Sequence, residues 1–116
     1  MNLIGHYING KEIPGTSNRT SDVFNPATGE VQAKVSLATI EEMNQAVEIA
    51  KKTQPAWAAT NPQRRARVLM KFVDLLNRDM DKLAECLSRE HGKTLPDAAG
   101  DVVRGLEVVE YCIGAP

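Results

Sequence analysis

The apolar positions of the chain follow two different periods. Over residues 31–37, Val, Ala, Val and Leu alternate with Gln, Lys and Ser, which is the period of a half-buried strand. Residues 7–13 centre on Asn9-Gly10, a pair that suits the type I′ turn of a β-hairpin. The first 37 residues are therefore predicted to form a hairpin and further strands.

From Thr39 the period becomes helical. Thr39 and Glu42 have the spacing of a capping box, in which each side chain binds the other residue's amide. Pro55 is expected to end or kink this first helix, so that residues 55–59 form a short turn that packs Trp57. The predicted inner face consists of Ile40, Met43, Val47 and Ala50, widened by Ala46 and Ile49.

Three more helices are predicted. The second begins at Asn61-Pro62, an N-cap followed by proline at the first helical position, and the third runs from about Asp79 to Gly92. Thr94 caps the fourth, with Pro96 and Asp97 in its first turn. Their apolar stripes are Ala66, Leu69, Phe72, Val73 and Leu76, then Met80, Leu83, Ala84 and Leu87, and finally Ala98, Val102, Leu106, Val109 and Ile113.

The predicted fold class is α+β, with a hairpin and strand segment over residues 1–37 and a helical segment over residues 38–116. Val103 and Val108 lie off the main stripe of the last helix, which indicates a second buried contact. The helical segment is apolar on more sides than its own core needs, and the chain stops soon after an apolar helix. We therefore expect a truncated chain, part of whose core belongs to something else.

Composition narrows the function classes. The net charge of −1 gives no electrostatic basis for binding nucleic acid or an anionic membrane, and no apolar run is long enough to cross a bilayer. The polar start of the chain is not typical of a signal peptide. Cys86 and Cys112 have no metal or redox spacing, so reduced thiols packed in the core of a cytoplasmic protein are expected, with a disulfide between them as the alternative.

The sequence contains no recognisable catalytic or dinucleotide motif, and no cysteine or histidine cluster with metal-ligand spacing. His6 and His91 neighbour no plausible nucleophile, and His91 is better placed to favour a helix C-terminus as a cation. A basic cluster of Arg64, Arg65, Arg67 and Lys71 could bind an anion. A solvated helix face explains that cluster more simply.

Arg104 has two interpretations. Asp101 and Glu107 lie three residues before and after it, so an ordinary ladder of surface ion pairs would account for all three. Alternatively, the planar guanidinium fork could bind a substrate carboxylate with two hydrogen bonds. Gly105 beside it would allow a ligand or another backbone to approach closely.

Several segments resemble landmarks of the aldehyde dehydrogenase superfamily. They are residues 7–10 (YING), 24–30 (FNPATGE), Trp57, 64–67 (RRAR) and 90–93 (EHGK). His91 departs from many relatives, which have another residue there. Residues 92–110 (GKTLPDAAGDVVRGLEVVE) resemble the CoA-acylating methylmalonate-semialdehyde dehydrogenases in particular. The resemblance covers essentially this whole chain but only an N-terminal share of a typical family member.

The resemblance implies the N-terminal part of the α/β aldehyde dehydrogenase fold, which packs on an NAD-binding domain. In that branch a cysteine thiolate attacks the semialdehyde, hydride passes to NAD, and CoA takes the acyl group. Neither Cys86 nor Cys112 matches the nucleophile's motif, so no catalytic, cofactor-binding or metal residue is carried over. Arg104 matches the arginine that helps to hold the substrate carboxylate in relatives, and it is the only predicted substrate-binding residue.

The resemblance therefore predicts an N-terminal fragment of a CoA-acylating, NAD-dependent methylmalonate- or malonate-semialdehyde dehydrogenase, inactive alone and unable to bind NAD or CoA well. A fragment of a non-acylating aldehyde dehydrogenase and a free-standing helical interaction module remain alternatives. Exposed apolar helix faces predict homo-oligomerisation or self-association.

Overall fold

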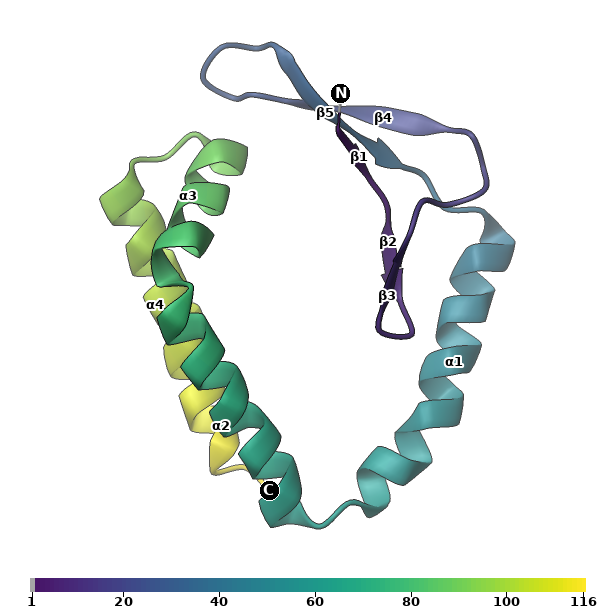
Figure 1. Cartoon of the computed structure of the whole chain (residues 1–116), viewed down its shortest axis with the longest axis vertical. Coiled ribbons are helices and arrows are strands. Elements are labelled where there is room, and N and C mark those ends of the chain that lie inside the picture. Colours follow the sequence, from purple (N-terminus) through teal and green to yellow (C-terminus); the bar gives the residue numbers. More distant parts are fainter. Residues whose placement is uncertain (1) are drawn as a thin grey trace. The chain divides into compact units, whose positions relative to one another are not determined.

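The computed structural model describes residues 2–116, which contain five strands and four helices (Figure 1). The strands are β1 (Asn2–Ile4), β2 (His6–Ile8), β3 (Lys11–Ile13), β4 (Thr20–Phe24) and β5 (Val31–Ser36). The helices are α1 (Ile40–Ala59), α2 (Pro62–Arg78), α3 (Met80–His91) and α4 (Leu95–Ile113). By their internal contacts the residues divide into unit 1 (1–58) and unit 2 (59–116). The predicted α+β class is confirmed.

Unit 1 contains the predicted hairpin, because Asn9 and Gly10 take the positive φ angles of 55° and 73° that its turn requires. Strands β2 and β3 pair antiparallel around this turn, with His6 opposite Ile13. A second sheet has the strand order β1-β5-β4, in which β5 is parallel to β1 and antiparallel to β4. The alternating residues 31–36 form the central strand, and Ala33 on it is buried.

The first helix is anchored at Glu42. Thr39 and Glu42 form the predicted capping box: the Thr39 amide donates to Glu42 Oε2 at 2.8 Å, and the Glu42 amide donates to Thr39 Oγ1 at 3.0 Å. Glu42 Oε1 also accepts from the Thr16 amide at 2.7 Å, which ties the loop after β3 to α1. These bonds compensate for the burial of a carboxylate that is only 8% exposed.

Two expectations for α1 were wrong. Its partly covered positions are Ala46 and Ile49 beside the hairpin, whereas Ile40, Met43 and Val47 are 56–69% exposed, because the short hairpin covers only one side of the helix. The helix also continues through Pro55 to Ala59, so Pro55 does not end it and residues 55–59 do not form a separate turn. Proline removes only its own amide from the ladder, and the alanines at 56, 58 and 59 are strong helix formers that favour continuing the helix. Trp57 is consequently helical and 45% exposed.

Unit 2 is a bundle in which α4 packs against α2 and α3. Asn61 caps α2 by accepting from the Gln63 amide at 2.9 Å, as predicted. The predicted stripe of α4 is confirmed, with Ala98 and Leu106 buried and Val102, Val109 and Ile113 half-buried. Phe72 was expected in the stripe of α2 but is 46% exposed, since it lies at the edge of the contact with α4.

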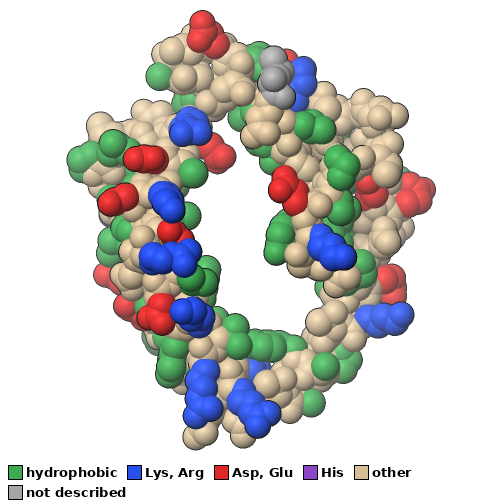
Figure 2. Space-filling view, in the orientation of Figure 1, with side chains coloured by type: hydrophobic (Ala, Val, Ile, Leu, Met, Phe, Trp, Pro, Cys, Tyr) green, Lys and Arg blue, Asp and Glu red, His purple; other side chains and the backbone are tan. Residues whose placement is uncertain are grey.

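Both units leave much apolar surface open. The described residues expose 8731 Å². Two separate compact units that share the 12.7 kDa of the chain equally would expose only about 7,500 Å². Figure 2 shows hydrophobic side chains between the charged ones on the surface of unit 2. Within residues 2–116, no helix combines the length and hydropathy needed to cross a membrane.

Candidate functional site

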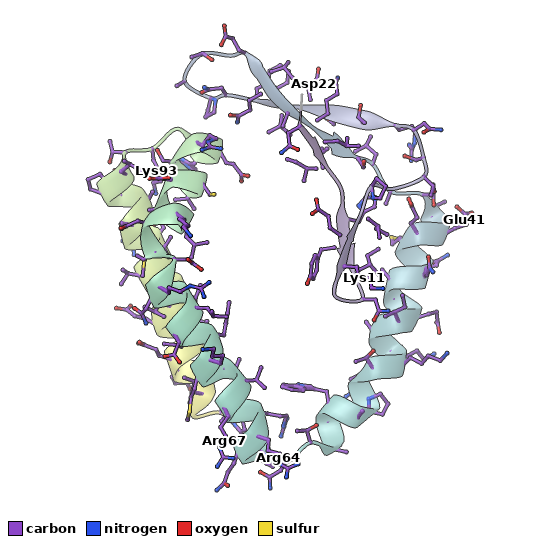
Figure 3. The ribbon with its side chains drawn as sticks, viewed as in Figure 1. Lys11, Asp22, Glu41, Arg64, Arg67 and Lys93 are labelled. Atoms are coloured by element: carbon purple, nitrogen blue, oxygen red, sulfur yellow. The ribbon has the colours of Figure 1, made fainter. Side chains whose placement is uncertain are left out.

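The junction between α3 and α4 positions the side chains of the candidate site. Gly92 ends α3 in the left-handed conformation, with φ at 84°, and its amide binds the Ser88 carbonyl. Ser88 Oγ donates to the carbonyl oxygen of Lys93 at 2.7 Å. Thr94 then caps α4 by accepting from the Asp97 amide at 3.4 Å. The Lys93 carbonyl is therefore held by Ser88 just before α4, at the junction where Figure 3 labels Lys93.

A three-residue ion-pair chain runs from this junction along α4. Lys93 Nζ binds Asp101 Oδ2, and Arg104 Nη1 lies 3.3 Å from Asp101 Oδ1. The side chains are progressively more exposed, from 21% for Lys93 through 36% for Asp101 to 81% for Arg104. The Lys93 hydrogen bond is the main cause that lowers the pKa of Asp101, aided by the charges of Lys93, Arg104 and His91 and opposed by partial burial.

Only one of the two predicted ion pairs of Arg104 forms. Within residues 2–116, the structure has no ion pair between Arg104 and Glu107, although both lie on α4 three residues apart. The guanidinium thus uses Nη1 on Asp101, while Nη2 and Nε form no protein hydrogen bond among the described residues. Arg104 therefore forms an ion pair through Nη1 while its other two nitrogens, Nη2 and Nε, are left to bind a ligand.

Lys93 is the member of this chain that sequence reasoning missed. It lies eight residues before Asp101 and outside α4, so no i,i+3 or i,i+4 spacing connects the two. The sequence feature that could have indicated this contact is Gly92, which ends α3 in the left-handed conformation and turns Lys93 toward the next helix.

An apolar groove of about 480 Å³ runs between the helices of unit 2. Gly105 lines this groove, and a Cβ added there would meet nothing within 4 Å, so contacts inside this chain do not require a glycine. The groove is lined by Phe72 and Leu76 of α2, Leu83, Cys86, Leu87 and Glu90 of α3, and Val102, Gly105, Leu106 and Val109 of α4.

The other candidate residues form no catalytic arrangement within residues 2–116. Both cysteines are free thiols, and Cys112 is half-buried. The expected core position of Cys86 is wrong, because this residue is exposed at the apolar groove of unit 2. In the same range, no group of three His, Cys, Asp or Glu side chains could hold a metal ion. His6 was considered alone in the sequence, but its Nε2 lies 3.9 Å from Glu42 Oε2 in unit 1.

The basic cluster lies on the first half of α2. Figure 3 shows Arg64 and Arg67 pointing away from that helix. Arg64, Arg67 and Lys71 are exposed, whereas Arg65 is half-buried and its Nε has no hydrogen-bond partner in the described structure. This arrangement suits the solvated face that the sequence favoured over an anion site.

The described residues do not fit a dinucleotide. A pyrophosphate needs a glycine-rich turn between a strand and the N-terminus of a helix. In residues 2–116, the parallel strands β1 and β5 are connected through β2, β3 and β4 rather than through a helix. Within residues 2–116, this parallel pair therefore lacks the strand–turn–helix connection that a Rossmann-type dinucleotide site uses.

Comparison with known proteins gives one consistent family. The model of the aldehyde dehydrogenase family matches residues 13–116. The malonate-semialdehyde dehydrogenase of Pseudomonas aeruginosa is 45% identical over 116 residues, which is all of this chain and 23% of that protein. An acylating, mitochondrial methylmalonate-semialdehyde dehydrogenase of Arabidopsis thaliana is 48% identical over 113 residues, or 97% of this chain and 18% of its own length.

Solved structures agree with these relatives. A protein of Sinorhizobium meliloti 1021, described as a methylmalonate-semialdehyde dehydrogenase complexed with NAD, has a TM-score of 0.96 and 65% identity, covering 100% of this chain and 24% of that one. The methylmalonate-semialdehyde dehydrogenase of Oceanimonas doudoroffii has a TM-score of 0.95 and 42% identity, with the same two coverages of 100% and 24%. The chain thus spans about a quarter of the length of these proteins.

Proposed function

The chain belongs to the aldehyde dehydrogenase family, and we propose that it is the N-terminal segment of a CoA-acylating, NAD-dependent methylmalonate- or malonate-semialdehyde dehydrogenase. The observation that carries this proposal is the 65% identity to the Sinorhizobium meliloti protein over the whole of residues 1–116. In the proposed enzyme, Arg104 holds the carboxylate of the semialdehyde, while the nucleophile and the sites for NAD and CoA lie in other parts of a longer protein.

The free edge of Arg104 supports the carboxylate role. A carboxylate can bind two guanidinium nitrogens at once, and Nη2 and Nε form no hydrogen bond to the described protein. The surroundings of Arg104 are also unlike an ordinary solvated face. Val108 and Tyr111 follow one and two turns later on the same side of α4 and are 62% and 83% exposed. Such an apolar surface suits contact with the rest of an enzyme better than contact with bulk water.

A chimaeric enzyme tests the proposal. Residues 1–116 replace the matching quarter of the Sinorhizobium meliloti protein, and NADH formation is followed with malonate semialdehyde or propionaldehyde and CoA. Arg104→Lys keeps the charge but loses the fork. We expect the KM for malonate semialdehyde to rise about tenfold or more, since a hydrogen bond to a charged group contributes about 1.5–3 kcal/mol. The KM for propionaldehyde, which has no carboxylate, should change less than about twofold.

Arg78→Lys is the matched control for this experiment. Arg78 is also an exposed helical arginine that binds an aspartate, Asp79, but it lies at the end of α2. It should leave the preference between the two aldehydes unchanged. Equal losses on both aldehydes with Arg104→Lys would instead favour a purely structural ion pair.

NAD and CoA enter the proposal only through the longer protein. The described residues contain neither a nucleophile motif nor a dinucleotide cradle, so the 116-residue chain alone is expected to form no NADH from a semialdehyde. Reproducible NADH formation by the purified chain would contradict this part of the proposal.

Exposed apolar faces favour a second candidate, an interaction module that associates with another copy of itself. Ile40, Met43 and Val47 on α1 and Val108 and Tyr111 on α4 could all be buried by a partner. Sedimentation of the chain across a range of concentrations tests this candidate. A strictly monomeric chain would leave the dehydrogenase segment as the better explanation.

A further inference from the structure

We propose that Asp101 is a positioning residue for Arg104, which it holds so that one edge of the guanidinium stays available to a substrate carboxylate. This inference rests on the proposed function, since it assigns a role within the same binding site. The observation behind it is the ion-pair chain of Lys93, Asp101 and Arg104.

The two oxygens of Asp101 are used separately. Oδ2 binds Lys93 Nζ, and Oδ1 lies 3.3 Å from Arg104 Nη1. Lys93 is itself held, because its carbonyl accepts from Ser88 Oγ at 2.7 Å and its side chain is only 21% exposed. Lys93 thus holds the Asp101 carboxylate at the α3–α4 junction. The held carboxylate can orient Arg104, although the arginine side chain is 81% exposed.

Fixing Nη1 has a direct consequence for binding. A free arginine side chain loses rotamer freedom when it binds a ligand, and orienting it in advance reduces that loss. Nη2 and Nε remain on the open edge of the fork. With two positive charges and one negative, the ion-pair chain keeps a net charge of +1 and still attracts an anion.

The competing interpretation predicts the opposite sign. If Asp101 merely neutralises Arg104, it competes with the substrate carboxylate for the guanidinium. Removing the aspartate charge would then strengthen the binding of acid-bearing semialdehydes. A positioning role predicts that the same change weakens it.

The test uses Asp101→Asn in the full-length chimaera, with Glu107→Gln as the matched control. Glu107 has the same charge and lies the same number of residues from Arg104, but it forms no ion pair with it in the described structure. We expect Asp101→Asn to raise the KM for malonate semialdehyde about three- to fivefold, as befits an exposed ion pair. The KM for propionaldehyde and both kcat values should stay within about twofold.

Two further variants separate positioning from folding. Asp101→Glu restores the carboxylate and should recover part of the lost affinity. Lys93→Met removes the anchor of Asp101 and should raise the same KM in the same direction. Thermal melting of each variant shows how far the folded enzyme is retained. Parallel losses on propionaldehyde, in step with a lowered melting temperature, would overturn the positioning role.

The outcomes distinguish this inference from the proposed function. Suppose that Arg104→Lys raises the KM for malonate semialdehyde selectively, but Asp101→Asn leaves that KM unchanged or lowers it. Only the role of Asp101 is then wrong. If Arg104→Lys also affects both aldehydes equally, the carboxylate site itself is wrong. A rise in KM with Glu107→Gln as large as with Asp101→Asn would show a general charge effect and overturn the inference.

Discussion

Replacing Leu106 by alanine tests how complete the core of unit 2 is. Leu106 is 8% exposed and lies on α4, where it also lines the apolar groove. The substitution removes three carbon atoms, and at about 0.8 kcal/mol for each the lost burial amounts to roughly 2–3 kcal/mol. The space left behind opens onto the groove, so water can enter it. The additional cost of an empty cavity should therefore be small in the isolated chain.

The same substitution should cost more in the full-length chimaera. If the rest of the enzyme covers the groove, the space becomes a closed apolar cavity, and the loss should rise toward about 4–5 kcal/mol. Amide hydrogen exchange of peptides from α4 measures the free energy of local opening in both contexts, with peptides from unit 1 as an internal reference.

Val108→Ala is the control, because Val108 lies on the same helix but is 62% exposed. In the isolated chain it should change the opening free energy by less than about 0.5 kcal/mol. An equal loss for Leu106→Ala in the two contexts would refute the idea that other parts of a longer protein close the groove.

Three other predictions concern local features of the fold. The hydrogen bond from the Thr39 amide lowers the pKa of Glu42 below its usual 4.5, against the opposing effect of partial burial. The ionised carboxylate therefore stabilises the folded chain above pH 4.5, and this stabilisation is lost as the pH falls through the lowered pKa. Glu42→Gln should flatten this acid dependence in thermal melts between about pH 3 and pH 7. Gly92→Ala should destabilise unit 2 by about 1 kcal/mol in urea denaturation, because φ is 84° there. Gly100→Ala, within α4 and with open space around it, should instead stabilise by about 0.5–1 kcal/mol.

Features that depend on neighbouring residues could be predicted from the sequence. The Asn9-Gly10 turn, the Asn61 cap and the Gly92 stop all follow from the conformational preferences of single residues. The capping box of Thr39 and Glu42 is equally local, since its partners lie within one helical turn. Each of these forms in the structure as expected.

Features that depend on tertiary contacts could not be predicted. Glu42 also binds the Thr16 amide, 26 residues earlier, because the loop after β3 folds back on α1. Lys93 reaches Asp101 only because Gly92 reverses the chain at the end of α3. Spacing rules assigned Asp101 to a simple ladder on one helix, and they missed the partner that lies outside it.

The mismatch on α1 is informative for the same reason. Hydrophobic periodicity reflects the surfaces that a sequence buries in its complete protein, whereas the exposures in the structure reflect burial within this chain alone. On α4 the two agree at Ala98 and Leu106, so that stripe is covered from within unit 2. On α1 they disagree at Ile40, Met43 and Val47, which unit 1 leaves exposed. This side of α1 is therefore open to a further contact, and under the proposed function substitutions there should destabilise a full-length enzyme more than the isolated chain.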